Sequence, residues 1–600
     1  MSTVEAAVTW DLSDLYGGLD DPRILGDCRT LLERAEAFES RYRGRIAAPD
    51  CDAATLRAAL DQLESIWREL AKPRTFASLA FSADTSDAAR GALLQKTQEE
   101  GTAVTKHLIF FDLEIGAMPE ENFARLAGAP EITEYRHYLE HERRAAKHHL
   151  TEAEEKIVQE LSNSGVRAFE RLFNEISSRA RFRVGVKGEE RELTQSEVLA
   201  LLYDPDRDVR KAAAEAFTET LRGQSHAVGF IFNTLLQHKG TIDRLRRYEY
   251  PEQSRHEANE LDREVVDQMV EVTVSNYDVV ADYYELKRKL LGLEELTHYD
   301  RYAPVFRTEA QIPFEEARET VLSAFAAFAP GMREMAEPFF TRRWIDAELR
   351  GGKRGGAFCS AVTPDLHPYV FMNYTGKARD VMTLAHELGH AIHDVLASKH
   401  NYLNFHPTLP LAETASVFAE MLVFERVTEQ ITDPKEKLAL LAGKIEDTFA
   451  TVFRQVAMFR FEQKAHEARR TEGELPPERY NALWQESIQE MFGGSLKLGE
   501  DHAWWWLYIQ HVFSWPFYVY AYAFGELLVL ALYARYRQEG APFVQRYFDL
   551  LAAGGSEKPD EILARVGIDV HKREFWQGGC DLIREMVEKA KALAGQVSPS

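Results

Sequence analysis

The chain has 600 residues, of which 45% are hydrophobic and 28% charged, and this composition excludes both a disulfide-stabilised miniprotein and a disordered chain. Its 72 Lys and Arg against 96 Asp and Glu give a net charge of -24. Because this charge repels phosphate backbones and anionic lipids, we expect neither nucleic acid nor a membrane surface as a partner.

Four cysteines are scattered along the chain, with no close pair that would indicate a cysteine zinc site or a disulfide framework. They are Cys28, Cys51, Cys359 and Cys580. The N-terminus has neither a basic start nor an apolar core, so no signal peptide is predicted. Together these features predict reduced thiols in a cytoplasmic protein.

The most apolar stretch, residues 512–530, is interrupted by Pro516 and Glu526 and is rich in tyrosine. A membrane-spanning helix needs about 20 predominantly apolar residues with few or no charges. We therefore expect a buried core helix in this stretch.

Helical patterns joined by short turns fill most of the chain, and only 35 Gly and 22 Pro interrupt them. Capping boxes, in which a hydroxyl accepts a backbone N–H and an acid three residues later reaches back, mark two helix starts. These are Thr151 with Glu154 and Thr194 with Glu197. The chain is therefore predicted to be mainly α.

A short exposed hairpin is predicted between these two helix starts. Phe182, Val184 and Val186 alternate with other residues, and Gly188 then allows a turn. We place a domain boundary after this hairpin, near residue 195. It divides an N-terminal helical region, 1–195, from a second region, 196–600.

A second strand signal lies at residues 357–363 and 369–375, with a turn between them. The second arm is β-branched and aromatic, and Pro368 before it is typical of an edge strand because proline cannot donate to a ladder. An unpaired edge can bind an extended peptide through main-chain hydrogen bonds, which makes Tyr369 and Asn373 candidate substrate-binding residues. The alternative is a hairpin that only covers the core.

The pentapeptide His386-Glu387-Leu388-Gly389-His390 carries the strongest chemical signal. At 100° per residue, the neighbouring apolar residues form one stripe of a helix, and His386 and His390 lie about 40° apart on the opposite side. Two imidazoles one turn apart on one face can bind a single Zn²⁺, and Glu387 beside them can polarise a water molecule.

Two histidines do not complete a catalytic zinc site, so a third ligand is needed. His393 lies about 10 Å along the helix from His386, which is too far to share an ion with zinc–nitrogen bonds of about 2 Å. The third histidine of a metzincin is also absent, because Leu396 occupies its position. The third ligand must therefore come from another segment.

A second helical pattern, residues 410–420, supplies candidates. Glu413, Ser416 and Glu420 share one face within about 60°, while the opposite face is apolar. Carboxylates on an otherwise apolar helix are costly to bury without a partner, and a metal with its histidines would be one. We predict Glu413 as the third ligand and Glu420, two turns on, as the group that orients an imidazole. Both acids could instead lie on a solvated face.

These features resemble the M3 family of zinc oligopeptidases and, within it, the oligoendopeptidase F group. The most specific match is the segment 386–393 followed by a glutamate on the next helix. The resemblance extends over most of the chain, through residues 10–16, 204–210, 351–356, 412–416 and 516–522.

The resemblance implies a large, almost all-helical body in two lobes around a deep central channel, as in the thimet-type members, with a small β-hairpin beside the zinc helix. It implies one Zn²⁺ per chain and hydrolysis of internal bonds in short peptides. It also implies that residues 196–600 form the M3 catalytic domain and residues 1–195 an N-terminal domain of the oligoendopeptidase F type. The oligomeric state is left open.

In this family, a histidine and tyrosines of a C-terminal segment stabilise the tetrahedral intermediate. The matching stretch implies this role for His511, Tyr522 and Tyr518, in that order. Because Pro516 breaks any helix through the stretch, only Tyr518 and Tyr522, four residues apart, are expected to share a face. These tyrosines could instead be amphipathic core residues with a satisfied hydroxyl.

The glycine-rich segment 351–356 precedes a strand and lacks the spacing of a phosphate-binding loop. The resemblance implies a mobile loop over the substrate, with Gly355 and Gly356 as substrate-binding residues.

The expected reaction is peptide-bond hydrolysis. Zn²⁺ on His386, His390 and Glu413 supplies Lewis-acid activation, Glu387 transfers the proton of the attacking water, and His511 with a tyrosine donates hydrogen bonds to the oxyanion. Two alternatives stay open. One is an M32-type zinc carboxypeptidase, which also pairs this motif with a downstream glutamate, and the other is an inactive peptide-binding protein on the same fold.

Overall fold

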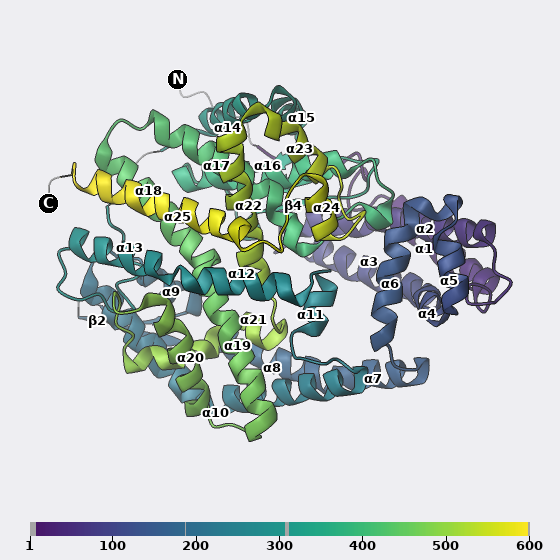
Figure 1. The fold of residues 1–600 in the computed structure, drawn as a ribbon, viewed down its shortest axis with the longest axis horizontal. Helices are drawn as coiled ribbons and strands as arrows, with labels where there is room; N and C mark the ends of the chain where they lie inside the picture. Colours follow the sequence, from purple (N-terminus) through teal and green to yellow (C-terminus); the bar gives the residue numbers. More distant parts are fainter. Residues whose placement is uncertain (1–7, 187, 307–310, 598–600) are drawn as a thin grey trace. The chain divides into compact units, whose positions relative to one another are not determined.

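A computed structural model describes residues 8–186, 188–306 and 311–597. In this part of the chain α-helices dominate, and the named strands form one two-stranded and one three-stranded sheet (Figure 1). The prediction of a mainly α protein with small β elements is therefore confirmed. None of the helices in these ranges combines the length and the apolar character that crossing a membrane requires.

The chain folds into two compact units that interleave in sequence. Unit 1 comprises the described residues of 1–147, 310–427 and 535–568, and unit 2 those of 148–309, 428–534 and 569–600. Each unit is therefore assembled from segments that are far apart along the chain. The domain boundary near residue 195 and the channel implied by the resemblance stay predictions.

Unit 1 begins with a helical bundle that has its own apolar core, to which Leu60, Phe110 and Tyr135 belong. The bundle consists of α1 (Arg23–Tyr42), α2 (Ala53–Ala83), α3 (Ala88–Lys106), α4 (Ile109–Ala117), α5 (Glu120–Ala127), η1 (Pro130–Tyr135), α6 (Arg136–Ala145) and the following turn η2 (Ala146–His148). The later elements are α14 (Phe314–Phe328), α15 (Pro330–Thr341), β3 (Ile345–Asp346), β4 (Phe358–Ser360), β5 (Tyr369–Phe371), α16 (Ala378–Ala397), η3 (Tyr402–Asn404), α17 (Leu409–Gln430, whose end passes into unit 2), α23 (Ala541–Leu551) and α24 (Pro559–Arg565).

The three-stranded sheet of unit 1 lies against α16. Its order is β3-β5-β4, with β3 parallel and β4 antiparallel to β5. The predicted hairpin is thus present as β4 and β5, but the prediction that its second arm is an edge strand is wrong. Residues 345–346 gave no strand signal, yet they pair with β5 and make it the central strand. Pro368 precedes the ladder and therefore removes no hydrogen bond from it.

The N-terminal segment packs against this sheet. The Trp10 ring lies 5.4 Å from that of Phe371 and 6.2 Å from that of Tyr369, between centroids. The Val8 carbonyl accepts the N–H groups of the two residues that follow β3. Residues 10–16, part of the family resemblance, therefore have a packing role in the described structure.

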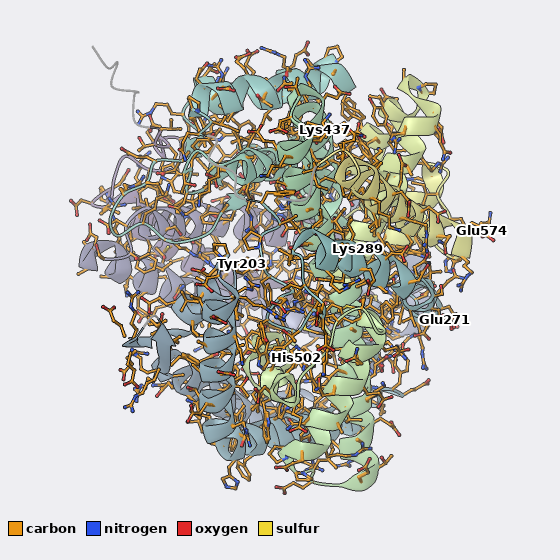
Figure 2. All side chains as sticks on the ribbon, turned by 90° about the vertical axis from the view of Figure 1, so that its left-hand side faces the viewer. Tyr203, Glu271, Lys289, Lys437, His502 and Glu574 are labelled. Atoms are coloured by element: carbon orange, nitrogen blue, oxygen red, sulfur yellow. The ribbon has the colours of Figure 1, made fainter. Side chains whose placement is uncertain are left out.

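Unit 2 is built around the long helix α10 and carries many buried aromatic side chains, among them His502, labelled in Figure 2. Its elements are α7 (Glu152–Ser164), α8 (Val166–Arg179), β1 (Phe182–Val186), β2 (Glu189–Leu193), α9 (Gln195–Leu201), α10 (Arg207–Arg246), α11 (Gln253–Ala258), α12 (Arg263–Ser275), α13 (Tyr277–Leu290), α18 (Pro434–Thr451), α19 (Phe453–Glu472), α20 (Pro477–Phe492), η4 (Glu500–Tyr508), α21 (Gln510–Ser514), α22 (Tyr520–Glu539, whose end passes into unit 1) and α25 (Arg573–Ala594).

The local predictions for unit 2 are confirmed. Thr151 and Thr194 each form a complete capping box with the glutamate three residues later. The predicted hairpin is the antiparallel pair β1 and β2. Its turn passes through Gly188, whose φ of 84° suits glycine.

The apolar stretch at residues 512–530 is not one core helix. α21 ends at Ser514, a turn contains Pro516, and α22 starts at Tyr520. The prediction of a buried helix holds from Tyr520 onward, because residues 520–533 are buried with the exception of Tyr522. Tyr522 is thus singled out by its exposure.

Candidate active site

The two motif histidines lie on α16, whose apolar residues Leu384, Ala385 and Leu388 are buried. His386 and His390 are only partly buried, and their ring centroids are 5.0 Å apart. The helical spacing therefore brings both imidazoles to one side of the helix, as predicted.

Gly389 allows α17 to approach α16 closely. A Cβ atom at this position would lie 2.5 Å from the carbonyl oxygen of Ala415 and 2.6 Å from the Cα atom of Ser416. Side-chain carbons do not approach backbone atoms so closely, so only glycine fits at this crossing. The crossing brings Glu413, near the start of α17, to the two histidines.

Three side chains from these helices converge on one point. Glu413 Oε2 lies 3.3 Å from His386 Nε2 and 3.5 Å from His390 Nε2. The ligand atoms of a tetrahedral Zn²⁺ with bonds of about 2.0–2.1 Å are about 3.3 Å apart. Two imidazoles with one carboxylate are also a donor set that catalytic zinc sites use. The residues present therefore fit a zinc ion.

Each histidine has a second partner that orients its ring. Glu420 Oε2 lies 3.5 Å from His386 Nδ1, which is the position that its predicted role requires. The carbonyl group of Ala412 accepts a hydrogen bond from His390. Such partners fix the tautomer and the orientation of metal-binding imidazoles. The contribution of Ala412 comes from its backbone, so no side-chain signal in the sequence could predict it.

His393 stays outside the candidate metal-binding group, which consists of His386, His390 and Glu413, as its distance along the helix predicted. Its imidazole is buried and bonds to the Ala412 carbonyl. Burial lowers the pKa of His393 to about 3, so the ring is neutral. It is a structural residue of α16.

Burial and mutual attraction set the charges of the three candidate ligands. Burial opposes the ionisation of Glu413, but His386, His390 and a hydrogen bond from Ser416 outweigh it and lower the pKa of Glu413 to about 2. Burial also lowers the pKa of His390, to about 4. For His386, hydrogen bonds to Glu413 and Glu420 outweigh burial and raise the pKa to about 10. Binding of a metal ion here would therefore displace a proton from His386, since only a neutral imidazole can be a ligand.

Glu387, the predicted general base, follows His386 on α16. Its side chain is buried, and its carboxylate accepts the backbone N–H of Cys359 on the edge strand β4. Burial raises the pKa of Glu387 to about 7, a value at which a carboxylate exchanges protons efficiently near neutral pH. Like the Ala412 contact, this contact is made by a backbone group and cannot be predicted from the sequence.

The glycine-rich loop, residues 351–356, is tied to the body of unit 1. Lys353 Nζ lies 2.7 Å from Asp346 Oδ1, and both side chains are buried. The Gly352 carbonyl accepts the N–H of Thr85 at 2.7 Å. Lys353 therefore neutralises a buried aspartate.

The predicted substrate-binding residues of unit 1 differ in exposure. Gly355 and Gly356 are exposed, with open space on their Cβ sides. Asn373 Nδ2 donates to the carbonyl groups of Arg354 and Gly356, at 2.9 and 3.0 Å, and so holds the loop in place. Tyr369 is completely buried, which leaves its side chain no surface for a substrate.

The predicted oxyanion donors form one cluster in unit 2. His511 Nε2 lies 3.3 Å from the Tyr522 hydroxyl. The rings of His511 and Tyr518 stack at 6.0 Å, and those of Tyr518 and Tyr522 lie 5.2 Å apart, between centroids. Tyr518 precedes α22, so the turn and not helical phase brings it to Tyr522.

The turn before α22 has a strained backbone, and the side chains of Glu462 and Arg255 form hydrogen bonds with it. Phe517 has a φ of 58°, in the left-handed region that bulky residues rarely adopt. Its N–H donates to Oε1 of the fully buried Glu462 on α19, at 3.0 Å. Arg255 Nε donates to the Pro516 carbonyl at 3.4 Å. Glu462 thereby contacts the turn between α21 and α22, and sequence reasoning missed it because its partner is a backbone group 55 residues away.

Two protein-family models match this chain. The model of Peptidase family M3 matches residues 200–582, and the model of Oligopeptidase F matches residues 114–182. Oligopeptidase PepF of Bacillus subtilis is 26% identical over 100% of this chain and 89% of its own length. An oligoendopeptidase F homolog of Lactococcus lactis is 26% identical over 98% of this chain and 97% of its own length.

Solved structures show the same fold. A crystal structure of a Chlamydophila abortus protein described as a peptidase has a TM-score of 0.88 and 25% identity, with 98% of each chain covered. Oligoendopeptidase-F from Enterococcus faecium has a TM-score of 0.72 and 20% identity, with 96% of this chain and 98% of that chain covered. Because the M3 model alone spans well over half of the sequence, the chain belongs to peptidase family M3, within its oligoendopeptidase F group.

Proposed function

We propose that the chain is a zinc endopeptidase that hydrolyses internal bonds of short peptides. The observation that carries this proposal is the distance of Glu413 from His386 and His390, which matches the spacing of ligands around a tetrahedral zinc ion. Membership of a peptidase family supports peptides as the substrate class.

The reaction divides between the metal ligands and one base. His386, His390 and Glu413 would hold the ion, and a bound zinc ion would activate water and polarise the scissile carbonyl as a Lewis acid. Glu387 accepts the proton of the attacking water and delivers it to the leaving amine. Its contact with the Cys359 N–H keeps the carboxylate in place for both transfers.

His511 and Tyr522 are proposed to donate hydrogen bonds to the oxyanion, with Tyr518 as the second tyrosine. Such donors contribute about 3–4 kcal/mol each. Tyr522→Phe removes one hydroxyl and should lower kcat about 100-fold. Tyr520→Phe is the matched control, because its hydroxyl is buried and bonds to Asn259 at 2.8 Å. An equal loss in both variants would argue against a role for Tyr522.

Digestion of a nonapeptide, followed by mass spectrometry with and without a chelator, tests the activity. Internal cuts that stop on chelation and return with added Zn²⁺ are the expected result. Removal of single residues from the C-terminus would instead indicate an M32-type carboxypeptidase. No cuts, together with a zinc content near zero by elemental analysis, would leave an inactive peptide-binding protein.

A further inference from the structure

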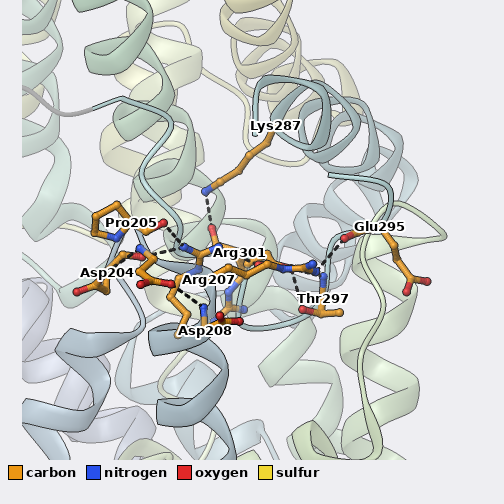
Figure 3. A network of polar contacts seen from close by, with 11 residues as sticks. Asp204, Pro205, Arg207, Asp208, Lys287, Glu295, Thr297 and Arg301 are labelled. Atoms are coloured by element: carbon orange, nitrogen blue, oxygen red, sulfur yellow. Dashed lines mark hydrogen bonds and ion pairs between the residues drawn. The ribbon is translucent and has the colours of Figure 1, made fainter. Parts of the chain in front are cut away.

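A buried turn in unit 2 holds Arg301 in a fixed position. The preceding residue, Asp300, is completely buried and bonds to Arg207 and Arg210 at the start of α10. Lys287 Nζ donates to the carbonyl oxygen of Arg301 at 2.5 Å (Figure 3). The backbone of Arg301 is therefore anchored before any ligand arrives.

The guanidinium group of Arg301 lies among aromatic rings. Its Cζ atom is 4.2 Å from the centroid of the Tyr302 ring and 6.0 Å from that of Phe492. Tyr203, whose ring centroid lies 5.1 Å from that of Tyr302, is 59% exposed and is labelled in Figure 2. The guanidinium group is thus partly enclosed, with an exposed tyrosine at its border.

Arg454 on α19 is the neighbouring charge. Burial, together with the positive charge of Arg454, lowers the pKa of Arg301 to about 10. Arg454 Nη2 donates to the Tyr508 hydroxyl at 2.9 Å. After burial, Arg454 is also the charge that lowers the pKa of His511. Arg454 therefore lies near His511, one of the predicted oxyanion donors of unit 2.

In other parts of the described structure, pairs of neighbouring basic residues form ion pairs with one buried aspartate. These pairs are Arg207 with Arg210 on Asp300, Arg350 with Lys353 on Asp346, and Lys239 with Arg470 on Asp243. Arg301 and Arg454 form no ion pair with any residue that the structure describes. Two like charges in a half-buried position are unfavourable unless an anion compensates them.

We propose that Arg301 and Arg454 form a binding site for a carboxylate group of the peptide substrate. The planar guanidinium group matches a carboxylate with two parallel hydrogen bonds, and Arg is preferred over Lys for this purpose. The inference rests on the proposed peptidase function and adds the chemistry of the substrate to it. The carboxylate is either the C-terminus of the peptide or an acidic side chain.

Two peptide pairs separate these sources. One pair has the same sequence with a free C-terminal carboxylate or a C-terminal amide, and the other has Glu or Gln at one internal position. For one pair, the KM of wild type should be at least about tenfold lower for the charged peptide than for the uncharged peptide. Arg301→Gln and Arg454→Gln should remove this difference and leave kcat within a few-fold.

Arg460→Gln is the matched control, because Arg460 lies on the same helix and has a carboxylate partner in Glu490. It should keep the discrimination of wild type. Discrimination in either peptide pair that both arginine variants lose supports the site and names the source of the carboxylate. Equal KM values within both pairs for wild type, or discrimination that survives in both variants, would overturn it.

Binding without turnover separates this inference from the proposed function. In Glu387→Gln, titration calorimetry with the same peptides should show the carboxylate preference, and adding Arg301→Gln should abolish it. If wild type cleaves no peptide, the proposed function fails, but this binding result still decides the carboxylate site. Should a Gln variant lose its thermal melting transition, Arg301→Lys or Arg454→Lys replaces it. Lysine keeps the charge without the two-pronged geometry, so undiminished discrimination there contradicts the proposal.

Discussion

The candidate metal-binding group of unit 1 and the aromatic cluster of unit 2 are positioned in different ways. In unit 1, regular helices place His386, His390 and Glu413, and the side chains attract one another electrostatically. In unit 2, a turn with a left-handed Phe517 places His511 and Tyr522, and uncharged groups make most of the contacts. Helical spacing can therefore bring the charged side chains of unit 1 together. The uncharged donors of unit 2 depend instead on the backbone conformation of a turn, which a residue of another helix, Glu462, stabilises.

Glu387→Gln should abolish the proton transfer proposed for unit 1 and leave the positions of the proposed metal ligands unchanged. The amide keeps the size of the side chain but cannot accept a proton, so kcat should fall about 10³- to 10⁴-fold. Zinc content, measured by elemental analysis, should stay near that of wild type. Asp394→Asn is the control, since Asp394 is a half-buried acid on the same helix outside the metal-binding group. Activity near the wild-type level in Glu387→Gln would remove it from the mechanism.

Gly389→Ala should change the positions of the proposed metal ligands in unit 1 and leave their identity unchanged. The added Cβ meets the backbone of α17 at 2.5 Å, so the two helices must separate and Glu413 must move away from the histidines. We expect a loss of about 2 kcal/mol in stability and about 100-fold weaker zinc binding, measured by competition with a chelator.

Gly443→Ala in α18 is the control for this change, because a Cβ there meets nothing within 4 Å. It should be neutral or stabilising by up to about 1 kcal/mol, as expected for glycine in a helix interior. Zinc binding in Gly389→Ala equal to that of wild type would show that the close crossing does not position Glu413.

Glu462→Leu should produce the corresponding effect in unit 2. Leucine fills a similar volume but cannot accept the Phe517 N–H, so the turn should relax and the His511–Tyr522 contact should loosen. We expect kcat to fall about 30-fold, a fraction of the loss of one oxyanion donor, with zinc content unchanged. Glu462→Gln keeps an acceptor oxygen and should restore most of the rate. If both variants are equally impaired, the hydrogen bond is not the cause.

Glu420→Gln should have a smaller effect in unit 1, because Glu420 contacts the His386 imidazole and is not one of the proposed metal ligands. Removing its charge weakens the orientation of His386, and zinc binding should weaken about tenfold. Glu425→Gln, on the same helix but outside the metal-binding group, should leave the affinity unchanged. Equal losses in both variants would point to a general effect of charge on α17.

The sequence predicted the parts of both regions that depend on side-chain type and regular spacing. His386, His390, Glu413 and Glu420 lie where helical periodicity put them, because α16 and α17 are regular helices. The central position of β5 and the turn at Phe517 were not predictable in this way. Both depend on backbone pairing with distant segments, which no local pattern encodes.

The pH dependence of the free energy of unfolding directly tests the state of Glu462, which contacts the turn. It is the smallest of the expected effects. Burial raises the pKa of Glu462 from 4.5 to about 8, so the folded chain keeps a proton that the unfolded chain releases. This contribution is complete below pH 4.5 and is lost as pH rises from there to about 8. Urea unfolding at several pH values should therefore show wild type losing stability relative to Glu462→Gln across this window. Other acids with raised pKa values are present in both proteins and cancel in the difference, so parallel curves would mean that Glu462 is ionised in the folded state.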